Sequence, residues 1–169
     1  MIYPDNFEQK IGFDKIRQMV DSKCVTNAAR KMLADTYFMT DAENLRTILL
    51  QVEEMRIICN MDSSFPDSGY VDVLPFLQKV NIEGAYLDTL ELFALKRALE
   101  TTKNIVAFFK RQDEEQYPAL RELIAQITVY PAVLDRIDTI ITPNGKRRDN
   151  ASEELLQIRR SVNAKQMQV

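Results

Sequence analysis

The sequence DTLELFALKRALETTKNIVAFFKR, residues 88–111, contains the longest helical pattern in the chain. Its first four residues form a capping box, in which the first residue, Asp88, caps the helix and Glu91 reaches back to the cap. The residues of one face follow at spacings of three and four: Leu92, Leu95, Leu99, Thr102, Val106 and Phe109. This spacing predicts an amphipathic helix roughly 36 Å long, around which the fold is organised.

Shorter helical patterns lie on both sides of this long helix. They cover about residues 13–23, a stretch after Thr26, a stretch after a capping box at 40–43, residues 73–80, and two stretches that begin at Pro118 and Pro131. The stretch after residue 43 carries an apolar stripe of Leu45, Ile48, Val52, Met55 and Cys59. Stripes of this kind are far more often core than cofactor sites. We therefore expect an all-α, multi-helix core.

The last part of the chain has a different pattern. Pro143-Asn-Gly145 predicts a tight turn, which leaves room for one small hairpin near residues 141–148. Residues 149–152 offer helix caps, and the helix after them has only a narrow apolar stripe. A stripe this thin suits a projecting arm or one partner of a coiled pair. Because no C-cap glycine or proline follows, we expect this helix to be cut off before its natural end.

Composition excludes several kinds of active site. The chain has 169 residues and no histidine, which rules out His-based nucleophile systems and His-ligated zinc. Its four glycines are too far apart for a phosphate-binding glycine loop. Adjacent acids such as Glu53 and Glu54 point to different faces of a helix, so they indicate solvated charge and not a general acid and base. We expect no catalytic, cofactor or metal site in these residues, and a globular domain that buries roughly 70% of its unfolded surface.

Charge is unevenly distributed along the chain. The formal net charge is −3, which argues against a uniform nucleic-acid coat, but the residues from Lys146 onward are net basic. The candidates for phosphate contact are Lys146, Arg147, Arg148, Arg159 and Arg160. A solvated helix face is the alternative explanation for this cluster, and the more common one.

The two cysteines and the N-terminus bear on the compartment. Cys24 and Cys59 occupy apolar positions of helical patterns, which favours two buried thiols in a reducing compartment, with a disulfide as the alternative. The N-terminus lacks a basic and apolar leader, and no apolar run approaches about 18 residues. The expectation is a cytoplasmic protein without a membrane partner.

Several short motifs occur in a fixed order from residue 1. They are Met1-Ile-Tyr-Pro4, Phe7-Glu8, Lys10-Ile-Gly-Phe-Asp-Lys-Ile-Arg17, Ile82-Glu-Gly-Ala-Tyr-Leu-Asp88, Glu91-Leu-Phe93, Asp149-Asn-Ala-Ser152 and Ile158-Arg-Arg160. Together they resemble the start of the bacterial MutS paralogues often called MutS-two. Each motif is short, and their shared order over essentially the whole chain carries the resemblance.

The resemblance implies the N-terminal core and lever region of a longer protein. Residues 1–149 are then the helical core domain, and residues 150–169 begin a lever helix that leads to a clamp domain outside this chain. In that family the longer protein has an ATPase domain, which binds ATP and Mg and forms a homodimer, and usually a C-terminal Smr endonuclease domain. The partners implied are DNA, including branched DNA in recombination, and ribosomes or rRNA, where collided particles are split.

Two functions from different classes follow. The first is a non-catalytic core and lever element of a MutS-like ATPase that clamps nucleic acid. The alternative is a free-standing helical interaction or dimerisation module that presents the stripe of residues 152–169 to a partner helix.

Overall fold

The computed structural model describes residues 6–167, which form nine α-helices. Their bounds are α1 Phe7–Ile11, α2 Phe13–Asp21, α3 Asn27–Ala34, α4 Ala42–Met61, α5 Leu74–Val80, α6 Thr89–Arg111, α7 Pro118–Ala125, α8 Pro131–Ile140 and α9 Glu153–Gln166. The all-α prediction is confirmed. In the described part of the chain the expected hairpin is reduced to an isolated antiparallel bridge between Ile141 and Arg147. The motif at residues 1–4 and the last two residues lie outside the described residues.

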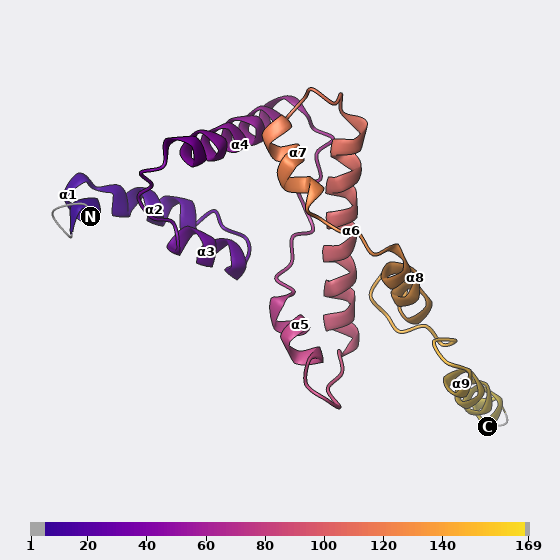
Figure 1. Ribbon diagram of the computed structural model, residues 1–169. Coiled ribbons are helices and arrows are strands. Elements are labelled where there is room, and N and C mark those ends of the chain that lie inside the picture. Colours follow the sequence, from indigo (N-terminus) through magenta and orange to yellow (C-terminus); the bar gives the residue numbers. More distant parts are fainter. Residues whose placement is uncertain (1–5, 168–169) are drawn as a thin grey trace.

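The helices are arranged around α6, which is the long rod that the sequence predicts (Figure 1). Helix α5 runs beside one half of α6, and α7 folds back beside the other half. Helix α4 extends sideways from that second end and leads to α1–α3 at its far end, whereas α8 and α9 trail away on the opposite side of α6. The result is an elongated molecule with two arms.

The main hydrophobic core lies where α4, α6 and α7 meet. Its buried members are Ile58, Phe108, Phe109 and Leu120, with Met55, Phe65, Ile105, Tyr117 and Ile124 packed against them. Three edge-to-face ring pairs connect Phe65, Phe108, Phe109 and Tyr117 in series, with centroids 5.2, 5.3 and 6.3 Å apart. Aromatic pairs in this geometry stabilise a core beyond the area that they bury.

A buried carboxylate ties α4 to α7 within this core. Glu54 is only 5% exposed, and its two carboxylate oxygens accept from the backbone N–H groups of Ala119 and Leu120 at 3.1 and 2.8 Å. The N-cap residue of α7, Tyr117, makes no side-chain capping bond. Glu54 therefore caps α7 from another helix, and its negative charge lies at the positive end of the helix dipole.

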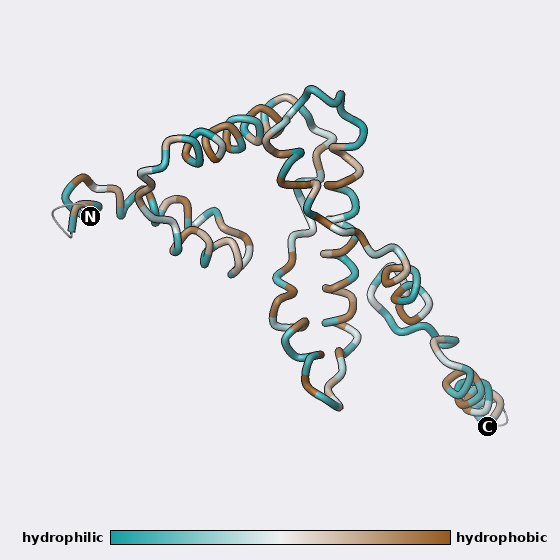
Figure 2. Tube along the Cα trace, viewed as in Figure 1, coloured by the Kyte–Doolittle hydropathy of each residue, from teal (hydrophilic) through white to brown (hydrophobic). Residues whose placement is uncertain are grey.

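The chain exposes more surface than a compact domain does. Its accessible surface is 13381 Å², whereas a compact monomer of the same mass exposes about 8,600 Å². The chain thus buries roughly half of its unfolded surface, so the expectation of roughly 70% burial is wrong. Hydrophobic residues continue along α4 beyond the core junction (Figure 2).

The N-caps of α6 and α4 were both predicted from the local sequence, and one of the two predictions is confirmed. The capping box at Asp88 is confirmed, because its carboxylate accepts from the N–H groups of residues 90 and 91 while Glu91 accepts from the Asp88 N–H at 2.8 Å. The box at residues 40–43 is wrong by one position: Asp41, not Thr40, caps α4 and accepts from Glu43 and Asn44. A carboxylate is the better acceptor of two donors, and it displaces the hydroxyl.

The predicted buried faces of α4 and α6 are corrected by the structure. In α4 the stripe residues Leu45 and Val52 are exposed, and the buried positions are Glu54 and Ile58. Cys59, expected to be buried, is exposed, Cys24 is half-buried, and both are free thiols. In α6 a charged residue, Lys96, interrupts the buried face, at 6% exposure. Over residues 6–167, no helix combines the length and the apolar character that crossing a membrane requires.

Candidate nucleic-acid interface

A tight turn carries three of the five candidate cations. Thr142 donates its N–H to the Lys146 carbonyl at 2.7 Å, Gly145 donates to the Thr142 carbonyl at 2.9 Å, and Arg148 donates to the Ile140 carbonyl at 2.8 Å. Gly145 has a φ of +73°, and a Cβ there would lie 3.0 Å from the Phe93 ring of α6. The predicted turn is therefore confirmed, and it needs glycine for both its backbone angle and its packing.

The turn, the start of α6 and helix α9 enclose a polar cleft of about 660 Å³. Its lining residues are Thr89, Thr142, Lys146, Arg147, Arg148, Asp149 and Arg159. The structure thus brings together four of the five predicted cations from two elements that are about ten residues apart in the sequence. Arg160 is exposed on α9 and does not line the cleft, because neighbouring residues of a helix point in different directions.

Two of the four cleft cations have structural partners. Arg148 donates from Nε to the carbonyl oxygens of Asp138 and Ile141, at 2.7 and 3.1 Å, and it is half-buried. Arg159 forms an ion pair with Asp149 at 3.2 Å, in which both side chains are largely exposed. Arg148 therefore holds the turn in place, and Arg159 is partly neutralised.

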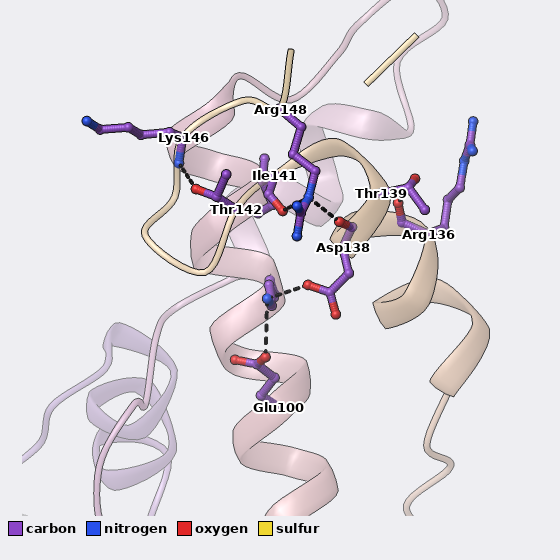
Figure 3. A network of polar contacts seen from close by, with 9 residues as sticks. Glu100, Arg136, Asp138, Thr139, Ile141, Thr142, Lys146 and Arg148 are labelled. Carbon is purple, nitrogen blue, oxygen red and sulfur yellow. Dashed lines mark hydrogen bonds and ion pairs between the residues drawn. The ribbon is translucent and has the colours of Figure 1, made fainter. Parts of the chain in front are cut away.

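Lys146 and Arg147 are the cations that the cleft leaves for a ligand. Both side chains are exposed, and neither makes a side-chain hydrogen bond or ion pair with any residue in the range 6–167. Figure 3 shows the Lys146 side chain extending away from the surrounding polar network. Their positive charges are available to an anion without first breaking an internal contact.

A polar network that the sequence did not predict connects this turn to α6. The Lys96 ammonium of α6 contacts Asp138 of α8 and also Glu100 at 3.5 Å, and the Asp138 backbone carbonyl accepts from Arg148 (Figure 3). The hydrogen bond that Lys96 donates to the Asp138 carboxylate is the main cause that raises the pKa of Lys96, so the residue is charged. The spacing of Lys96 and Glu100 was visible in the sequence, but the distant partner Asp138 carried no local signal.

The side chains of the cleft suit electrostatic binding of an anion. Its lining combines cations and two threonine hydroxyls, which suit the oxygens of a phosphate, with the Asp149 carboxylate, which pairs with Arg159. Within residues 6–167, no three His, Cys, Asp or Glu side chains gather closely enough to hold a metal ion. The geometry therefore fits a phosphate contact that neutralises one or two charges, and such contacts carry no sequence specificity.

Comparison with known proteins finds relatives that carry the name Endonuclease MutS2. The chain is 30% identical over 156 residues to Endonuclease MutS2 of Alkaliphilus oremlandii, which covers 92% of this chain and 20% of the relative. It is 35% identical over 134 residues, 78% of this chain and 17% of the relative, to Endonuclease MutS2 of Pelotomaculum thermopropionicum. The same name belongs to a relative from Alkaliphilus metalliredigens that is 27% identical over 92% of the chain.

These matches confirm the resemblance that the motifs predicted. The chain spans about a fifth of the length of the curated relatives that it matches. No family model matches the chain, and no solved structure does.

Proposed function

Because this chain is homologous to the MutS2 proteins over about nine tenths of its length, we propose that it is a non-catalytic core and lever element of a MutS-like protein that clamps nucleic acid. The observation that carries this proposal is the homology itself, since it covers about nine tenths of the chain rather than one motif. The alternative, a free-standing interaction or dimerisation module, is not favoured by relatives of this kind.

The proposal assigns the division into a core of residues 1–149 and a lever that begins at residue 150. In the longer protein, ATP and Mg bind in another domain, which dimerises, and a separate endonuclease domain cuts nucleic acid. The substrate is DNA, with branched DNA as the form bound, or the rRNA of a ribosome. The present chain contributes rigid helices and a small number of phosphate contacts.

The internal contacts support a mechanical role. Lys96 fastens α8 to the rod α6, and Asp138 and Arg148 fasten the turn at 142–148 to α8. Close-packed elements that are held in this way shift as bodies instead of deforming smoothly. Movement of the turn is therefore transmitted to α6 through fixed contacts, and α9 joins the turn through the exposed ion pair between Arg159 and Asp149.

The proposal is tested by the salt dependence of DNA binding. The purified chain is expected to bind branched DNA weakly and without sequence preference, because Lys146 and Arg147 are the two cleft cations whose side chains make no hydrogen bond or ion pair among residues 6–167. Two phosphate contacts predict a slope of about −1.8 for log K against log salt concentration. Lys146→Gln with Arg147→Gln is expected to bring the slope close to zero, whereas Lys15→Gln with Lys31→Gln, on α2 and α3, leaves it unchanged.

Two results would contradict the proposal. One is tight binding at physiological salt, which would make the chain a binding domain in its own right. The other is a slope that the Lys146 and Arg147 substitutions leave intact, since the phosphate contacts would then lie elsewhere.

A further inference from the structure

A second hollow lies between α6, α7 and the link to α8, and it shares no residue with the basic cleft. Its volume is about 790 Å³, and its lining residues are Lys103, Val106, Ala107, Phe109, Lys110, Arg121, Ile124, Ala125, Ile127, Thr128, Val129 and Pro131. Three of these are cations, and among residues 6–167 no Asp or Glu lines the groove. In a chain of net charge −3, this is a local concentration of positive charge.

The floor of this groove is shaped for side chains of a helix. Val106 and Ala107 from α6 face Ile124 and Ala125 from α7 across it, and Ile127 continues the apolar surface into the link. Alanine on both walls leaves room for another backbone to approach, and Val106, Ile124 and Ile127 supply aliphatic surface on which the side chains of a helix can pack. An apolar floor gives a nucleic acid few hydrogen-bonding groups.

Three cations lie along the rim of the groove: two exposed lysines, and one arginine that hydrogen bonds hold in position. Lys103 and Lys110 are both exposed and lie two helical turns apart on α6, about 10 Å along its axis. Neither forms an ion pair with a residue in the described part of the chain. Arg121 is held in position on the other wall by the carbonyl oxygens of residues 112, 113 and 116, at 2.6 to 2.9 Å.

We propose that this groove binds an amphipathic helix of a partner protein, one that carries carboxylates along the edges of its apolar stripe. The apolar face of that helix packs on Val106, Ile124 and Ile127. Its acidic side chains meet Lys103 and Lys110 on one rim and Arg121 on the other. The groove is an acidic-helix site, separate from the phosphate-binding cleft.

The test uses the whole 169-residue chain and two synthetic helical peptides, measured by fluorescence anisotropy. Both peptides have one stripe of leucines, which is flanked by glutamates in the first and by lysines in the second. The glutamate peptide is expected to bind, and the lysine peptide to bind at least about tenfold more weakly, because repulsion replaces attraction at the rims. Lys103→Glu with Lys110→Glu is expected to reverse this order.

Two further variants separate the groove from net charge and from folding. Lys15→Glu with Lys31→Glu makes the same change of charge on α2 and α3, and should leave the affinity within about twofold at moderate salt. Ala125→Trp fills the groove at an exposed position, and should abolish binding while the circular dichroism spectrum of the chain stays unchanged.

Several outcomes would overturn the proposal. These are no binding of the glutamate peptide, equal binding of both peptides, or binding that survives Ala125→Trp. If Lys103→Glu with Lys110→Glu instead abolishes self-association of the chain in sedimentation, the groove takes a second copy. If the same variant abolishes binding of branched DNA, the groove belongs to the nucleic-acid surface.

Discussion

Replacing Glu54 by glutamine tests the joint between α4 and α7 more sharply than any other single substitution. The carboxylate is buried and accepts two backbone N–H groups, at 3.1 and 2.8 Å. Glutamine keeps one acceptor oxygen, so one buried N–H faces an amide NH₂ group instead of a partner. Losing a charged hydrogen bond costs about 1.5–3 kcal/mol, and losing a charge at the helix N-terminus adds about 0.3–1 kcal/mol.

We therefore expect Glu54→Gln to lower the free energy of unfolding by about 2–4 kcal/mol. The measurement is urea unfolding followed by far-ultraviolet circular dichroism, with amide hydrogen exchange at Ala119 and Leu120 as a local readout. Glu53→Gln is the matched control, because Glu53 has the same chemistry but is exposed and pairs with the exposed Arg56. The reasoning fails if the two variants have equal midpoints, or if exchange at Ala119 and Leu120 does not accelerate in Glu54→Gln.

Two other substitutions test the turn and the helix cap. Gly145→Ala should destabilise the chain by about 1–2 kcal/mol more than Gly84→Ala in urea unfolding. Both glycines have positive φ, but only at Gly145 would a Cβ meet the Phe93 ring. Equal losses of stability in the two variants would show that the Phe93 ring moves aside. The pKa of Glu91 is lowered mainly by the hydrogen bond that it accepts from Lys79, and then by the one that it accepts from the Asp88 N–H. The carboxylate of Glu91 therefore stabilises the fold above the ordinary glutamate pKa of about 4.3. This stabilisation is lost as pH falls through the pKa that Glu91 has in the folded chain. The difference in urea midpoint between the native chain and Glu91→Gln should therefore shrink as pH falls from neutral, and a difference that stays constant down to pH about 3 would contradict this assignment.

Local sequence predicted where the helices begin, because caps and prolines act within one turn. Ser152 caps α9 through the Leu155 N–H, as the sequence indicated. A helix was predicted to begin after Thr26, and Thr26 caps that helix, α3, through the Ala29 N–H. The prolines at 118 and 131 both lie in first turns. Helix α1 was missed, since a helix of five residues leaves almost no periodic signal.

Sequence could not predict which faces of the helices are buried, because burial depends on distant partners. Glu54 is buried since α7, more than sixty residues later, presents its N-terminus to it. Leu45 and Val52 have the right spacing for a core stripe, yet α4 extends away from the main core: Val52 is 61% exposed, and Leu45 lies at an open hollow lined by α1, α2 and the link before α4.

Only part of the candidate site could be predicted, because the roles of its residues also depend on partners elsewhere in the sequence. The sequence identified Lys146 and Arg147 as a basic cluster, but it could not distinguish them from Arg148. Arg148 has the same charge, yet its guanidinium is used in hydrogen bonds that hold the turn. That distinction rests on the carbonyls of Asp138 and Ile141, which only the folded turn brings to the guanidinium.

The most direct test of the central claim is an amide chemical-shift titration of the ¹⁵N-labelled chain with branched DNA at low salt. If nucleic acid meets this chain at the basic cleft, the shifts will concentrate at residues 142–149 and along the first half of α9, and α1–α4 will not respond. Shifts that instead concentrate on α1–α4, or that spread evenly over the exposed lysines, would contradict the account.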